Sequence, residues 1–262
     1  MTVALASLGR SAVSRPASLN PTAAYWARYL CKQASGNVVD SSGNNRTAVL
    51  DADLVTAGNA WTANAGYFTC LNDAAGGNGG ATVPNSQIDI SYGIHSLVMM
   101  CRALIPSSVT AQEQIMGYGG GAVAGITMQK RPTGHELQLR LNRGTSTSYG
   151  VATGTALNDD VFHTLIMAVD GPAQIGFGWV DGVAQFTGTA LAASGSGSGR
   201  PDAAGFGFGH EGIGSGTTIP IQFDVIQIFK FIGNLPAQLA RGVAFLTRSP
   251  YEIMPESIWP VS

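Results

Sequence analysis

Short apolar segments alternate with turn-forming residues along most of this chain, a pattern typical of antiparallel β-structure. Clusters of Gly, Asn, Ser and Asp separate the apolar segments and predict tight turns between them. The predicted strands cover residues 25–30, 66–71, 96–104, 114–118, 125–129, 136–142, 162–169, 175–180, 205–209 and 219–231.

Three local patterns refine this picture. In 136–141, Leu alternates with Glu, Gln and Arg, which predicts a strand with one face on a core and the other toward water. Segment 223–229 is apolar on both faces, which predicts a central strand covered from both sides. The pair Asp181-Gly182 lies between two apolar runs and predicts a β-hairpin.

One helix is predicted after the last strand. Pro236 suits a first helical turn, and Leu239, Val243 and Leu246 follow at helical spacing on one face. Ser249-Pro250 should end the helix, because the residue before a proline avoids helical geometry. Residues 1–25 are rich in Ala, Ser and Pro without periodicity, which predicts an extended arm before a single domain over 26–262.

Composition limits the classes of protein that fit. Charged residues make up 11% of the chain, with 14 basic and 16 acidic residues, so the basic surface of a nucleic-acid-binding protein is not expected. No apolar run is long enough to span a membrane, and residues 1–10 lack the basic start of a secretory signal. Cys31, Cys70 and Cys101 follow no disulfide or zinc spacing and are expected to be buried.

The order of motifs resembles the concanavalin A-like, laminin-G-like jelly roll. Segment 39–45, with its Asp-Ser-Ser-Gly-Asn turn, is similar to a turn near the start of such domains. Segments 65–68, 162–171, 178–183 and 223–229 resemble four of the family's strands. The resemblance implies an all-β fold in which two antiparallel sheets form a jelly-roll sandwich, with one short C-terminal helix.

The C-terminal segment adds a second resemblance. Residues 235–255, which end in Ser-Pro-Tyr-Glu-Ile-Met-Pro, are similar to the ending of laminin-G-like proteins of tailed bacteriophages and prophages. This implies a virion protein that is assembled in the cytoplasm of a host bacterium. Its partners would be major capsid or tail subunits and further copies of itself, with a trimer as the analogous assembly.

Catalytic residues are not expected. Glycanases of this fold carry Glu-x-Asp-x-Glu on one strand, so that two carboxylates share a face, and none of the five Glu residues starts this motif. The resemblance does suggest calcium, with Asp40 and Asp224 as the matching positions. A hydrophobic residue, Val225, replaces the second acidic residue common in the family, so no cofactor is assigned and calcium stays a candidate.

Sugar binding would need aromatic faces that stack on pyranose rings. Several aromatic residues lie in or near predicted loops, although each could instead belong to the core. The candidates are Trp61, Tyr67, Tyr92, Tyr118 and Tyr149.

Three functions are compatible with these observations. The sequence favours a non-enzymatic structural protein of a phage particle, either a capsid decoration protein or a tail-associated subunit. The alternative is a module that attaches to glycans on the host surface. A glycan-cleaving enzyme is the third hypothesis, which the missing carboxylate pair disfavours.

Overall fold

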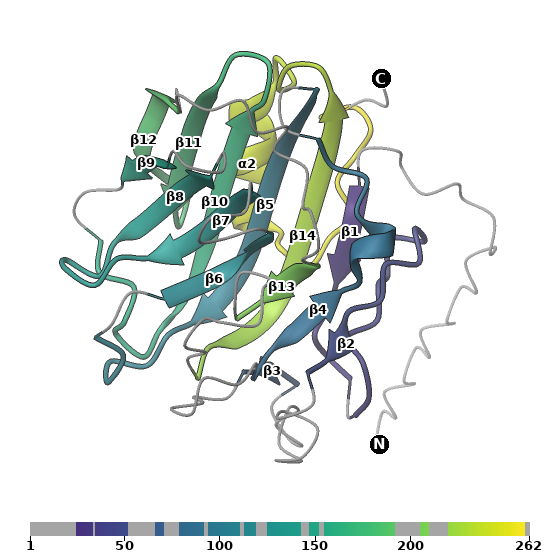
Figure 1. Cartoon of the computed structure of the whole chain (residues 1–262), viewed down its shortest axis with the longest axis vertical. Coiled ribbons are helices and arrows are strands. Elements are labelled where there is room, and N and C mark those ends of the chain that lie inside the picture. Colours follow the sequence, from purple (N-terminus) through teal and green to yellow (C-terminus); the bar gives the residue numbers. More distant parts are fainter. Residues whose placement is uncertain are drawn as a thin grey trace, which may run out of the picture.

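The computed structural model describes residues 25–33, 35–51, 66–70, 79–91, 94–110, 113–118, 125–142, 147–151, 155–191, 205–209 and 220–259. In this part, the chain forms two antiparallel sheets that pack face to face, with one α-helix, α2 (Leu239–Arg248), near the C-terminus (Figure 1). This confirms the predicted two-sheet sandwich.

The first sheet has the strand order β1–β14–β5–β10–β11–β12 in the described residues, and β3 also pairs with β14. Strand β14 therefore lies between β1 and β5 in the interior of the sheet. The strands are β1 (Tyr25–Tyr29), β3 (Phe68–Thr69), β5 (His95–Leu104), β10 (Phe162–Asp170), β11 (Ile175–Val180), β12 (Val183–Ala190) and β14 (Gln222–Ile232).

The second sheet has the order β2–β4–β13–β6–β7–β8–β9 in the same part of the chain. A short 3-10 helix, η1 (Asn85–Gln87), follows its second strand. The strands are β2 (Val49–Leu50), β4 (Ala81–Val83), β6 (Glu113–Tyr118), β7 (Gly125–Lys130), β8 (Leu137–Asn142), β9 (Thr147–Val151) and β13 (Phe206–Phe208).

The main core lies between the two sheets. Phe208 of the second sheet contacts Phe223 of the first edge to face, with ring centroids 6.5 Å apart. Cys101 on β5 lies against Met128 on β7, with 3.9 Å between the sulfur atoms. These fully buried side chains exclude water from the space between the sheets, and burial of apolar surface is the main favourable term in folding.

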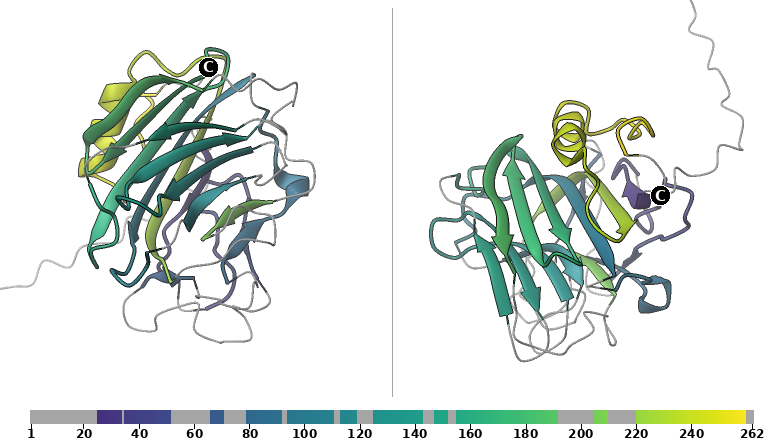
Figure 2. Two further views of the ribbon diagram at one scale, coloured as in Figure 1. Left: turned by 60° about the vertical axis from the view of Figure 1, so that its left-hand side comes forward. Right: turned by 90° about the horizontal axis from the view of Figure 1, so that it is seen from above.

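A second apolar layer covers the outer face of the first sheet. Helix α2 and the segment after it lie on this face, on the side away from the second sheet (Figure 2). Trp259 packs edge to face on Phe229, with ring centroids 4.7 Å apart, and Val243 and Leu246 of the helix join the same cluster. Strand β14 is therefore covered on both faces, as its apolar pattern predicts.

The predicted hairpin is confirmed, and two other local predictions need correction. Pro236 lies before helix α2, whose N-cap is Gln238, and not in its first turn. Asp181 and Gly182 have φ values of 50° and 80°, which form the turn between β11 and β12. Leu139 and its alternating neighbours on β8 face the core, but Gln138 is not directed to water as expected. The side chain of Gln138 is buried and accepts a hydrogen bond of 2.5 Å from Gln129 on the neighbouring strand, which offsets the cost of removing its amide from water.

Of the predicted N-terminal arm over residues 1–25, the structure describes only Tyr25. Strand β1 begins at Tyr25, one residue before the expected domain start, and 1–24 lie outside the described residues.

The three cysteines are buried, as the sequence predicts. Cys31, Cys70 and Cys101 are free thiols, and burial raises the pKa of each. Among the described residues, no helix has the length and hydropathy needed to cross a membrane.

A histidine between two carboxylates joins the β11–β12 hairpin to β10. Nδ1 of His163 lies 2.6 Å from Asp181, and Nε2 lies 3.1 Å from Asp159. Asp181 also accepts a hydrogen bond from the backbone amide of Thr164. Burial alone would lower the pKa of His163, but the hydrogen bonds and negative charges of the two carboxylates outweigh burial and raise it.

We expect His163 to make folding stability depend on pH. Its raised pKa means that the folded state holds the proton more tightly, so the stabilisation is complete below the unfolded pKa of about 6.5. It is lost as the pH rises through the folded pKa. Urea unfolding of the natural chain and His163→Gln should show a difference in free energy that shrinks from low to high pH.

His95 provides the control for this measurement. Burial and the nearby charge of Lys230 lower its pKa, so His95→Gln should change the pH dependence in the opposite direction. A stability difference between the natural chain and His163→Gln that stays constant across pH would contradict the role of His163.

Gly242 in helix α2 permits the close contact with Trp259. A Cβ atom at Gly242 would lie 2.1 Å from Cζ2 of the indole, which no side chain tolerates. We expect Gly242→Ala to destabilise the fold by about 1–3 kcal/mol through overpacking, although alanine favours helices. Thermal unfolding should show a lower Tm for Gly242→Ala. The double variant Gly242→Ala with Trp259→Leu should lose less stability than the two single variants lose together. An unchanged or raised Tm for Gly242→Ala would contradict the packing.

Candidate functional site

A buried carboxylate organises polar side chains on the outer face of the first sheet. Asp224 lies where the register of β14 shifts relative to β5, because Phe223 pairs with Ala103 and Val225 pairs with Arg102. This β-bulge gives Asp224 no partner in the ladder and directs its carboxylate out of the regular alternation. The carboxylate accepts hydrogen bonds from Lys32, Arg102 and the hydroxyl of Tyr251.

Aromatic rings surround these charges. The ammonium of Lys32 lies 5.0 Å from the centre of the Tyr67 ring and 5.5 Å from that of Tyr251. The guanidinium of Arg102 lies 4.9 Å from the ring of Phe162, which packs on Tyr67 with centroids 4.7 Å apart. We call this set the Asp224 cluster; it consists of Lys32, Tyr67, Arg102, Phe162, Asp224 and Tyr251.

The cluster is buried at its centre and open at its periphery. The side chain of Asp224 is 1% exposed, whereas those of Lys32 and Arg102 are 45% and 32% exposed. Tyr251 is exposed, and Tyr67 and Phe162 are half-buried. A ligand in solvent would therefore meet the cations and the aromatic rings, and the carboxylate would hold the cations in place.

Proton affinities in the cluster follow from this arrangement. Burial would raise the pKa of Asp224, but hydrogen bonds from Lys32, Tyr251 and Arg102 outweigh it and lower the pKa. The pKa of Tyr251 is raised by burial and by its hydrogen bond to Asp224. The carboxylate is therefore ionised at neutral pH, and the phenol keeps its proton and acts as a donor.

The segment after helix α2 brings Tyr251 to the sheet. The carbonyl of Pro250 accepts a hydrogen bond of 2.5 Å from Gln227 on β14. The guanidinium of Arg28 on β1 donates to the carbonyl of Tyr251 and to the hydroxyl of Ser41. These contacts fix the backbone on either side of the Tyr251 ring, so its position in the cluster is set by the fold.

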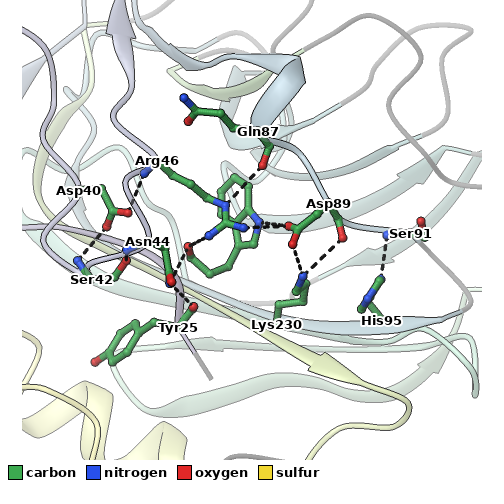
Figure 3. Close-up of polar contacts among 11 residues, drawn as sticks. Tyr25, Asp40, Ser42, Asn44, Arg46, Gln87, Asp89, Ser91, His95 and Lys230 are labelled. Carbon is green, nitrogen blue, oxygen red and sulfur yellow. Dashed lines mark hydrogen bonds and ion pairs between the residues drawn. The ribbon is translucent and has the colours of Figure 1, made fainter. Parts of the chain in front are cut away.

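A second carboxylate with two cations has a different arrangement (Figure 3). Asp89 accepts hydrogen bonds from Lys230 at 2.5 Å and from the indole of Trp26 at 2.7 Å, and Arg46 lies 3.2 Å away. Trp26 is 1% exposed, and the Arg46 guanidinium lies 4.9 Å from its ring centre. No free face of the indole remains for a ligand, so these residues join the loop before β5 to β1 and β14.

The calcium candidates have other roles in the structure. Asp40 accepts hydrogen bonds of 2.8–3.0 Å from the backbone amides of Arg28, Ser42 and Arg46, as a turn-forming aspartate does. Figure 3 shows the contacts with Ser42 and Arg46. Asp224 is paired with two cations, an environment that repels a metal ion. Across the described ranges, no three His, Cys, Asp or Glu side chains form a group that could hold a metal.

The five predicted sugar-binding aromatics have different outcomes. Tyr118 is corrected, because it is fully buried and packs on Phe206 with ring centroids 6.0 Å apart, so no sugar can reach it. Trp61 and Tyr92 lie outside the described residues. Tyr149 pairs with an arginine on β8, and its side chain is not among those described. Tyr67 belongs to the Asp224 cluster.

The structure thus joins two residues that the sequence suggested for different roles. Tyr67 was a sugar-binding candidate and Asp224 a calcium candidate, and both contact Lys32. Sequence reasoning missed Lys32, Arg102, Phe162 and Tyr251. The proline before Tyr251 signals the end of the helix, but nothing in the sequence indicates that the following ring returns to β14.

Sequence comparisons give no relative. No protein-family model matches the chain, and no curated protein matches it. The fold, by contrast, is shared with solved structures. A Trypanosoma rangeli sialidase in complex with sialic acid matches with a TM-score of 0.55 and 14% identity, over 89% of this chain and 34% of that chain.

Two other solved structures have the same fold. Domain 4 of a GH43 extracellular arabinanase from Geobacillus stearothermophilus, in complex with arabinotriose, matches with a TM-score of 0.53 and 15% identity. It covers 85% of this chain and 99% of that chain. A structure of botulinum neurotoxin type C, whose cell entry depends on two ganglioside molecules, has a TM-score of 0.56, 13% identity and coverages of 89% and 53%.

These comparisons correct the expectation that the chain is not an enzyme. The chain spans about a third of the length of the sialidases it matches, and the likeness at this identity concerns the fold. Because glycan-acting proteins share the sandwich, the missing Glu-x-Asp-x-Glu motif excludes only one catalytic arrangement.

Proposed function

We propose that this protein binds glycans and that the Asp224 cluster is its binding site. The observation that carries the proposal is the pairing of partly exposed cations with aromatic rings around one buried carboxylate. Aromatic faces pack on the apolar faces of sugars, and Lys32 and Arg102 offer hydrogen-bond donors to hydroxyl oxygens. Such a combination of apolar surface and a few placed polar groups is typical of ligand sites.

The comparisons support this proposal at the level of the fold. The arabinanase domain, which is matched over almost its whole length, is in complex with arabinotriose. The other two matches involve sialic acid and gangliosides. A fold does not determine function, so the argument depends on the residues of the Asp224 cluster. A host surface glycan is the ligand that the proposal favours.

A second proposal comes from the C-terminal segment. Its resemblance to laminin-G-like phage proteins suggests a subunit of a phage particle that carries the glycan site, with virion proteins and further copies of the chain as partners. The comparisons lend no support to the virion location. Mass spectrometry of purified particles should detect the chain in fixed stoichiometry, and its absence there would refute this proposal.

Glycan binding is tested with the full chain on a glycan array, followed by calorimetry on the sugars that bind. We expect Tyr67→Ala to weaken binding by about tenfold or more, as truncation of a central aromatic contact does. The control is Phe177→Ala, which removes a half-buried ring from β11 of the same sheet, outside the Asp224 cluster.

Two outcomes would contradict the proposed function. One is a folded protein that binds no sugar on the array. The other is binding that Tyr67→Ala and Tyr251→Ala leave unchanged, which would place the sugar elsewhere on the molecule. Thermal unfolding of each variant distinguishes lost contacts from lost structure.

A further inference from the structure

The two carboxylate clusters of the first sheet present opposite charges to solvent. In the Asp224 cluster the carboxylate is 1% exposed and its cations are 45% and 32% exposed. Around Asp89 the order is reversed, because the carboxylate is 50% exposed and Arg46 and Lys230 are 17% and 22% exposed. Equal numbers of charges therefore give a cationic surface at one cluster and a partly anionic surface at the other.

Neighbouring charges reinforce the cationic character of the Asp224 cluster. Two cations face one carboxylate, which leaves one positive charge in excess. Arg28 adds another beside Tyr251, and its guanidinium donates to two uncharged oxygens. Two acids on the same sheet, Asp159 just before β10 and Asp181 just after β11, are hydrogen bonded to His163.

The cations also retain donors for a ligand. An ammonium has three N–H donors and a guanidinium has five. Lys32 donates to Asp224, and Arg102 uses Nη1 for both Asp224 and the hydroxyl of Tyr251. The remaining donors lie beside the rings of Tyr67 and Phe162, where one ligand can contact a ring and a cation together.

We infer that the ligand of the Asp224 cluster is an anionic sugar. Its carboxylate or sulfate group would accept hydrogen bonds from Lys32 and Arg102, and the ring of Tyr67 would pack on the adjoining sugar face. Charge-assisted hydrogen bonds are stronger than neutral ones, so a neutral sugar should bind more weakly. This inference rests on the proposed glycan binding and specifies the ligand class of the same site.

The test uses lactose, its sialylated form and its sulfated form, together with an oligogalacturonide and its methyl ester. We expect the anionic member of each set to bind about tenfold or more tightly than the neutral member, with affinity falling as salt increases. Comparing the affinity of the sialylated and galacturonic sugars with that of the sulfated sugar shows whether the site prefers a carboxylate or a sulfate group.

Variants at Lys32 connect this preference to the cluster. Lys32→Met should weaken binding of the anionic sugar by about tenfold and binding of a neutral sugar much less, because the anion loses a charge-assisted hydrogen bond and the neutral sugar only an ordinary one. Lys32→Arg should retain the preference, because it keeps the positive charge. Arg241→Met removes an exposed positive charge from helix α2 and is the matched control, with no expected effect.

The outcomes separate this inference from the proposed function. Equal binding of anionic and neutral sugars that Tyr67→Ala abolishes would refute the charge preference and keep glycan binding. Anionic binding unaffected by Lys32→Met would place the anion at another site and refute the inference. Absence of binding to every sugar on the array and in these sets would refute both.

Discussion

The packing of the C-terminal segment on the outer face of the first sheet is the interaction on which the rest of the molecule depends. Strand β14 is apolar on both faces, so one layer of side chains cannot keep it from water. The second sheet covers one face, and helix α2 with Trp259 covers the other. The same packing carries Tyr251 back to the sheet and so completes the Asp224 cluster.

The cluster also shows how a fold can set the sign of a surface charge. A β-bulge places Asp224 beneath the cations instead of among solvent-exposed groups. The buried carboxylate restrains Lys32 and Arg102 and reduces the entropy that each would lose on binding a ligand. Around Asp89 the cations lie beneath the carboxylate, and the result is a structural link between loops.

Sequence patterns predicted the parts of the fold that are set by local chemistry. Asp181-Gly182, the helix after Pro236 and the two-sided burial of β14 follow from residues adjacent in the chain. Strand β12 was missed because it is an edge strand exposed along most of its length, and Phe186 is its one buried residue. Without a buried face, the alternation that marks a strand is absent.

The candidate site was predictable only in fragments. Lys32 and Asp224 are 192 residues apart, and their contact depends on strand order and on the bulge in β14, which no local pattern encodes. Tyr118 was misassigned for a related reason. A register shift between Gln114 and Met116 changes which positions of β6 face inward, and it puts Tyr118 in the core.

Asp224 serves the fold and the surface at once, and this constrains how the protein can evolve. A substitution there would disturb the anchoring of the C-terminal segment together with any recognition by the cations. Lys32 lies at the partly exposed edge of the cluster. A substitution there leaves the contacts of Asp224 with Arg102 and Tyr251 in place. New ligand preferences are therefore more accessible to natural variation at Lys32 than at the carboxylate beneath it.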